Sequence, residues 1–73
     1  MLLSELKEKQ SAVITSADCG GAFGIRLSDM GFREGERVLC VKRGLLSSPI
    51  LYSVNGSFVA IRKKDASKIE VVL

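Results

Sequence analysis

The sequence predicts a mainly β fold: a small β-barrel of about five short strands, with one short α-helix between the first and second strands. Three observations predict the β content: β-branched runs recur along the chain, glycine-containing turns separate them, and one segment alone has helical spacing. The 73 residues leave room for one hydrophobic core, and hence for a single domain over 1–73. In so short a sheet, barrel closure would remove exposed strand edges.

The first strand and the helix follow one another near the N-terminus. A first strand is expected over 11–17, which is rich in β-branched residues and ends at the turn formed by residues 18–21. The segment 22–30 places apolar side chains on one helical face, which predicts a helix packed on the core through Phe23, Leu27 and Met30. Gly31 follows where a left-handed helix cap favours glycine, and Phe32 is a further core candidate.

The second strand is expected over 37–43. Its centre, 38–41, is a short apolar run bounded by charged residues, which is typical of a strand covered on both faces. Cys40, inside this run, is interpreted as a small buried hydrophobic residue.

The C-terminal half contains a hairpin. Two β-prone runs, 50–54 and 57–62, flank Asn55-Gly56, a strong signal for a type I′ turn. The segment 63–68 is expected to form one helical turn capped by Asp65, and 69–72 is the last strand.

The cysteines and the absence of histidine restrict the chemistry. Cys19 and Cys40 share no metal-ligand spacing, so a closed zinc site cannot be built from one chain, and both are expected to be free thiols. No histidine can act as a general base and no phosphate-binding loop is present, so we expect no enzyme and no tightly bound cofactor. Asp18 and Cys19 are weak candidates for contacting Fe²⁺ or another transition metal, although an ordinary turn is favoured there.

Charge and hydropathy suggest a soluble cytoplasmic protein. The formal net charge is only +3, and the chain has neither a signal peptide pattern nor an apolar run long enough to span a membrane. The basic cluster at 62–64 is interpreted as a solvated face. A nucleic-acid-binding barrel is an alternative, but it requires aromatic stacking platforms, and only Tyr52 and Phe58 are available on strands.

Several separated blocks carry a family resemblance. The most specific block is R-L-x-x-M-G-F-x-x-G at 26–35. The later blocks comprise Val38, Pro49, Gly56, Ala60 to Lys63, Ala66, Ile69 and Val71. With these residues the chain resembles the FeoA family over nearly its whole length.

The resemblance implies an SH3-like barrel and a function in ferrous iron uptake. It implies a small cytosolic accessory protein that binds and regulates the cytosolic GTPase domain of a FeoB-type transporter, and that reaches the membrane only through this partner. No nucleic acid is expected. A metal-sensing domain is a further alternative, which would need ligands from two subunits.

Four residues are candidates for partner binding. Arg26 and Arg62 are basic contacts for an acidic partner, although Arg62 is favoured to bond backbone carbonyls that close the barrel. Leu45 and Leu46, in the loop 44–49, form an apolar docking tip if they are exposed. The favoured alternative is that they plug one end of the barrel.

Overall fold

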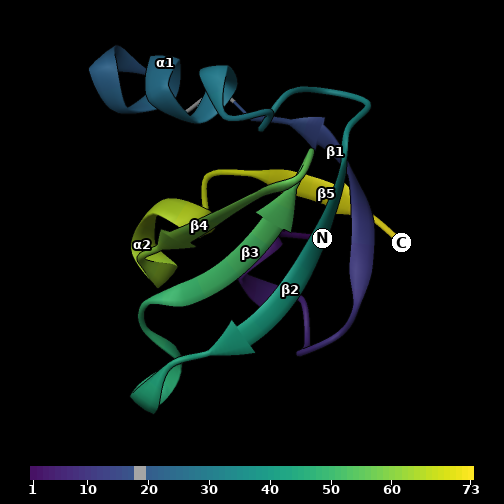
Figure 1. The fold of residues 1–73 in the computed structure, drawn as a ribbon, viewed down its shortest axis with the longest axis vertical. Coiled ribbons are helices and arrows are strands. Elements are labelled where there is room, and N and C mark those ends of the chain that lie inside the picture. The colour runs from purple at the N-terminus through teal and green to yellow at the C-terminus, as the bar shows by residue number, and fades with distance from the viewer. Residues whose placement is uncertain (18–19) are drawn as a thin grey trace.

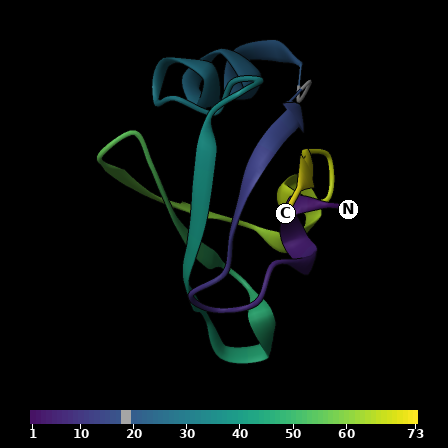
Figure 2. The same ribbon diagram turned by 90° about the vertical axis from the view of Figure 1, so that its right-hand side faces the viewer.

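The computed structural model describes residues 1–17 and 20–73. Its centre is a five-stranded antiparallel sheet with the strand order β4-β3-β2-β1-β5, which is strongly bent (Figure 1, Figure 2). The strands are β1 (Ser11–Ser16), β2 (Arg37–Arg43), β3 (Ile50–Val54), β4 (Ser57–Ile61) and β5 (Glu70–Val72). The helices are α1 (Gly21–Asp29) and α2 (Lys63–Ala66), with 3-10 turns η1 (Leu3–Glu5) and η2 (Leu45–Ser47). The five-stranded arrangement with one short helix between β1 and β2 is confirmed.

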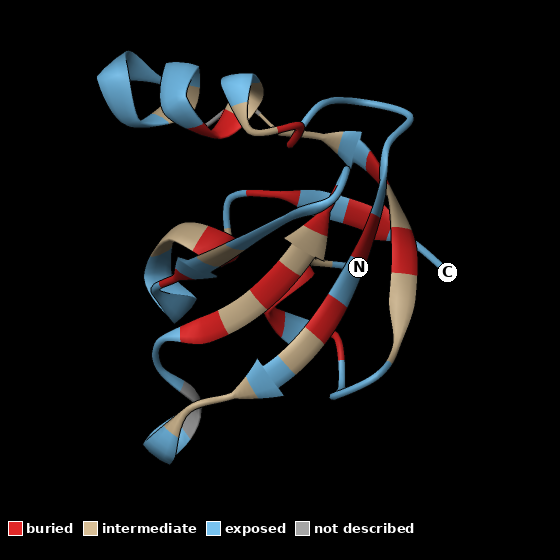
Figure 3. Ribbon diagram, in the orientation of Figure 1, coloured by how far each residue is buried: buried red, intermediate tan, exposed pale blue. Residues whose placement is uncertain are grey.

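The core lies on the concave side of the sheet. Side chains alternate between buried and accessible along β2 and β3, as Figure 3 shows. Phe32 and Tyr52 meet edge to face in this core, with ring centroids 6.5 Å apart. The expectation that 38–41 is covered on both faces is wrong, because Leu39 keeps 37% of its surface exposed while Cys40 is fully buried. In the part of the chain that the structure describes, no second layer covers the convex side, so only alternate residues of β2 are buried.

The β3–β4 hairpin has the predicted turn. Asn55 and Gly56 have φ angles of 50° and 80°, the positive values that a type I′ turn requires. Val54 pairs with Ser57 directly across this two-residue loop. The register of the hairpin therefore follows from the turn.

Gly31 joins α1 to the sheet. Its φ of 108° is accessible to glycine and strained for other residues, so the predicted glycine cap is confirmed. A Cβ atom at this position would lie 2.9 Å from the Cβ atom of Asn55. Gly31 therefore also allows the end of α1 to approach the tip of the β3–β4 hairpin.

The two edges of the sheet differ. The N-terminal segment covers β5: the Val71 N–H donates to the Met1 carbonyl at 2.7 Å, and the Leu3 N–H donates to the Ile69 carbonyl at 2.8 Å. Within residues 1–17 and 20–73, no strand pairs with the outer edge of β4. The expectation that closure removes exposed edges is therefore wrong at β4, because no strand of the described residues lies on its outer side to complete the barrel. The chain continues from β4 into α2 (Lys63–Ala66), which packs on η1.

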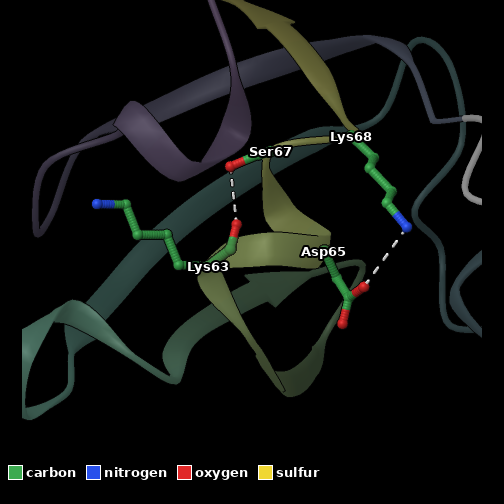
Figure 4. A network of polar contacts seen from close by, with 4 residues as sticks. All are labelled: Lys63, Asp65, Ser67 and Lys68. Atoms are coloured by element: carbon green, nitrogen blue, oxygen red, sulfur yellow. Dashed lines mark hydrogen bonds and ion pairs between the residues drawn. The ribbon is translucent and has the colours of Figure 1, made fainter.

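The helical turn after β4 begins earlier than expected. Arg62 is its N-cap residue, and its carbonyl accepts the N–H groups of Asp65 and Ala66 at 2.9 Å each. Asp65 therefore lies inside the first turn, where a carboxylate complements the helix dipole, and the expectation that it caps the helix is wrong. Its carboxylate lies 3.9 Å from the Lys68 ammonium, an ion pair drawn as a dashed line in Figure 4.

Candidate partner-binding surface

The β2–β3 loop carries two exposed leucines. Leu45 and Leu46 in η2 keep 89% and 91% of their surface exposed. The expectation that they plug the barrel is wrong, because the core is filled from the sheet and from residues of η1. Leu46 also has left-handed backbone angles (φ 60°, ψ 24°), which cost an L-residue free energy. An apolar, strained tip is the arrangement expected of a docking site.

The ends of this loop are held close together. The Gly44 N–H donates to the Pro49 carbonyl at 3.0 Å, and a Cβ atom on Gly44 would lie 2.6 Å from that carbonyl oxygen. Only glycine allows this approach. The two leucines are thus presented on a short loop with a closed base.

Arg43 anchors the loop to the N-terminal segment. Its guanidinium donates to the Leu6 carbonyl at 2.6 Å, and its backbone N–H donates to the Glu8 carboxylate at 2.8 Å. This is the cross-barrel contact to a carbonyl that the sequence suggests for Arg62. Sequence reasoning missed Arg43, because nothing in a charged strand end shows which basic side chain folds back onto the protein.

Arg62 instead is exposed. In the described part of the chain, no hydrogen bond or ion pair engages its guanidinium, so the expectation that it bonds backbone carbonyls is wrong. Lys63 and Lys64 follow it and are also exposed. Since Ile61 pairs with Ile50, Arg62 and the β2–β3 loop belong to the same end of the β3–β4 ribbon.

Arg26 lies elsewhere. It is exposed on α1, at the opposite end of the molecule from η2 (Figure 1). The structure therefore does not bring the four candidate residues into one patch.

Helix α1 packs on the core through a single buried residue, Leu27. The expectation that Phe23 belongs to the core is wrong, since it is 40% exposed. The helix projects from the barrel, so only its C-terminal turn reaches the core.

Comparison with known proteins identifies the family. The model of the FeoA domain matches residues 1–73. The chain belongs to the FeoA domain family.

Relatives of this FeoA domain include chains of very different length. It is 38% identical over all 73 residues to part of a Porphyromonas gingivalis Fe(2+) transport protein A/Fe(2+) transporter FeoB fusion protein, of which it spans only 9%. It is 30% identical to a Campylobacter jejuni protein named for Fe(2+) transport, of which it spans 99%. The Stenotrophomonas maltophilia FeoA, crystallised with zinc and described as a prokaryotic SH3 domain protein, superimposes with a TM-score of 0.83 at 35% identity, covering 97% of this chain and 88% of that one.

Of the two cysteines of this FeoA domain, Cys40 is the one that lies in the described part of the chain. Cys40 is a free, fully buried thiol, as expected, and burial raises its pKa, which keeps it neutral and unreactive. Asp18 and Cys19 lie outside the described residues, so a metal contact there stays a prediction. Among residues 1–17 and 20–73, no cluster of three or more acidic or cysteine side chains is arranged to hold a metal ion.

A shallow pocket of about 470 Å³ lies between the end of β1, the end of α1 and the following turn. Arg33 and Glu34 line it together with Ser16 and Ser28, and the Arg33 Nε donates to the Ser28 carbonyl at 2.9 Å. Its lining offers hydroxyl and charged groups but no paired nucleophile and base.

None of the helices in the described ranges has the length and apolar character needed to cross a bilayer.

Proposed function

We propose that this FeoA domain is an accessory protein of ferrous iron uptake that binds the cytosolic part of a FeoB-type transporter and regulates it, without being an enzyme itself. The observation that carries the proposal is the fusion protein of Porphyromonas gingivalis, in which a segment 38% identical to this chain is part of the same polypeptide as the transporter. Covalent linkage maintains a high local concentration of one domain beside the other. Such a fusion permanently joins two domains that, as separate chains, would bind each other only weakly.

The surface of the molecule supports a binding function. Leu45 and Leu46 present two nearly fully exposed apolar side chains on a loop with a closed base, and Arg62 adds a positive charge at the same end of the β3–β4 ribbon. Apolar anchors beside a rim of charge are typical of protein interfaces. Arg26, on the projecting helix, offers a second contact to a partner large enough to reach both ends of the barrel.

A nucleic-acid-binding function is disfavoured by the burial of one aromatic residue. Tyr52 is fully buried, and its hydroxyl donates to the Leu3 carbonyl at 3.1 Å, so it cannot stack on a base. Phe58 is exposed but has no aromatic neighbour on the strands of the described chain. Stacking platforms need several such side chains in a row along the strand path.

The test is a two-dimensional amide NMR titration of this chain with the isolated cytosolic GTPase domain of a FeoB-type transporter. We expect chemical shift changes at Leu45, Leu46 and Arg62, and at Arg26 for a partner that spans both ends. The double variant Leu45→Ser, Leu46→Ser is expected to weaken binding about tenfold or more, because it removes two apolar side chains from the interface. Leu73→Ser is the matched control, since Leu73 is also 70% exposed but lies at the C-terminus.

Regulation is tested in the same preparation by the rate of GTP hydrolysis with and without this chain. A change in the rate that the double variant abolishes and the Leu73→Ser control retains would support the proposal. Absence of shift changes with both the GTPase domain and the full-length transporter in lipid nanodiscs would overturn it.

A further inference from the structure

The open edge of β4 has features of a binding site for an extended chain. β4 is the terminal strand of the sheet, and in the described part of the molecule its outer edge has no strand partner. Its sequence, S-F-V-A-I, contains neither proline nor a charged residue, and its pairing with β3 has no bulge. Natural proteins use these three devices to block the pairing of exposed edges, and β4 uses none of them.

The register identifies which backbone groups face outward. Val54 and Ser57 flank the two-residue turn and therefore form a hydrogen-bonded pair, and such pairs alternate along an antiparallel ladder. Ser57, Val59 and Ile61 thus direct their N–H and C=O groups toward β3. The backbone groups of Phe58 and Ala60 point toward the open edge.

The side chains along this edge form a pattern from apolar to basic. Because side chains alternate in direction, Phe58, Ala60 and Arg62 share the convex face, and the backbone of Arg62 is still extended (φ −64°, ψ 144°). Phe58 is 69% exposed at one end, and the Cα atom of Arg62 lies roughly 13 Å further along the strand. Lys63 and Lys64 add two more exposed charges at this basic end.

The nearest acidic residue in the sequence does not neutralise this basic end. The carboxylate of Asp65 lies 3.9 Å from the Lys68 ammonium, and the Lys63 side chain points away from it (Figure 4). The basic end is therefore available to carboxylates from outside the molecule. Charge complementarity then specifies the occupant: an extended segment with acidic residues beside Arg62 and apolar residues beside Phe58.

We propose that the outer edge of β4 binds an extended acidic and apolar segment of the transporter partner as an added antiparallel strand. This rests on the proposed function, because it takes that partner as the source of the segment. Main-chain hydrogen bonds to Phe58 and Ala60 supply affinity, and the position of the acidic residues sets the direction. In an antiparallel strand, the acidic residues lie at the N-terminal end of the segment.

The direct test uses a synthetic peptide, three aspartates followed by alternating valine and threonine, and measures amide hydrogen exchange of the full chain by NMR. We expect new protection at the Phe58 and Ala60 amides and none at Ser57, Val59 and Ile61, whose amides already face β3. A peptide of the same composition with its aspartates at the C-terminal end is expected to bind several-fold more weakly. Equal binding of both peptides, or protection away from β4, would overturn the proposal.

Two pairs of variants examine the edge and the charge separately. Ala60→Pro removes an outward N–H that β3 does not use and is expected to weaken peptide binding about tenfold, whereas Ala60→Ser keeps the N–H and the affinity. Arg62→Gln is expected to weaken binding about two- to fivefold, and Lys7→Gln, an equal change of charge on a residue outside the sheet, is expected to leave it unchanged. Unchanged binding by Ala60→Pro would refute edge pairing.

A titration with the cytosolic part of the transporter separates this proposal from the proposed function. Shift changes at Leu45 and Leu46 without protection of the Phe58 and Ala60 amides would retain the function and overturn the edge proposal. No response at any residue would overturn both. Protection of the same two amides on concentrating the chain alone would assign the edge to a second copy and overturn the proposed occupant.

Discussion

The barrel and the segments that leave it use apolar residues in opposite ways. Inside the barrel, Phe32 and Tyr52 are almost completely buried and contact each other. On α1 and η2, Ile25, Leu45 and Leu46 are 65%, 89% and 91% exposed. A chain this short has little core to spare, so apolar side chains left in water there contribute little to folding and are available for binding.

The largest effect that this comparison predicts is in the barrel core. Phe32→Ala is expected to lower the free energy of unfolding by about 3–5 kcal/mol, because it leaves a cavity beside Tyr52. Phe23→Ala, the same change on α1, is expected to cost under about 1 kcal/mol. Urea unfolding followed by circular dichroism measures both, and similar losses would show that α1 is as well packed as the barrel.

The next largest effect on stability is expected at Gly31, which joins α1 to the barrel. Gly31→Ala is expected to cost about 2 kcal/mol or more, because the φ of 108° is strained for alanine and its Cβ would lie 2.9 Å from that of Asn55. Gly35→Ala is the control, since Gly35 also has a positive φ but a Cβ atom added there would meet no atom within 4 Å. An equal loss in both variants would mean that backbone strain alone, without the contact to Asn55, accounts for the effect.

A smaller effect concerns the buried hydroxyl of Tyr52. Tyr52→Phe is expected to cost about 1 kcal/mol at neutral pH, because the Leu3 carbonyl loses the hydrogen bond from the hydroxyl and keeps only that from the Leu6 N–H. Burial raises the pKa of Tyr52 above its ordinary value, so the fold favours the neutral phenol. The stability from this group is therefore complete below pH about 10, where an unfolded tyrosine begins to ionise, and it falls as the pH rises further.

The measurement is the free energy of unfolding between neutral and alkaline pH for both proteins. The wild-type chain is expected to lose more stability than Tyr52→Phe above pH about 10. Parallel pH profiles would contradict the assignment. All other residues are the same in both proteins, so the difference between the two profiles isolates the phenol.

The smallest effect is at the loop tip. Leu46→Gly relieves a left-handed conformation while removing little buried surface, so it is expected to be neutral or to stabilise by up to about 1 kcal/mol. Leu45→Gly, where φ is not positive, is expected to destabilise slightly. Thermal unfolding distinguishes them, and greater stability of Leu45→Gly would contradict the strain at Leu46.

Local features of the fold were predictable from the sequence, and several features of the site were not. The Asn55-Gly56 turn, the glycine at position 31 and the burial of Cys40 depend on near neighbours in the chain, and all are confirmed. The outward position of Phe23 was not predicted, and exposure of the loop leucines was the less favoured of two alternatives, because periodicity shows which face is apolar and not whether another element covers it.

The sequence by itself determined the order of strands and turns, the position of the helix and the family, because these depend on residue spacing and on conformations that few residue types can adopt. The tertiary structure alone decided which basic side chain folds back, Arg43 instead of Arg62, and which sheet edge stays open. Both outcomes depend on where the N-terminal segment lies: it accepts the Arg43 hydrogen bond and covers β5. Such contacts join residues far apart in the sequence, so no local pattern records them.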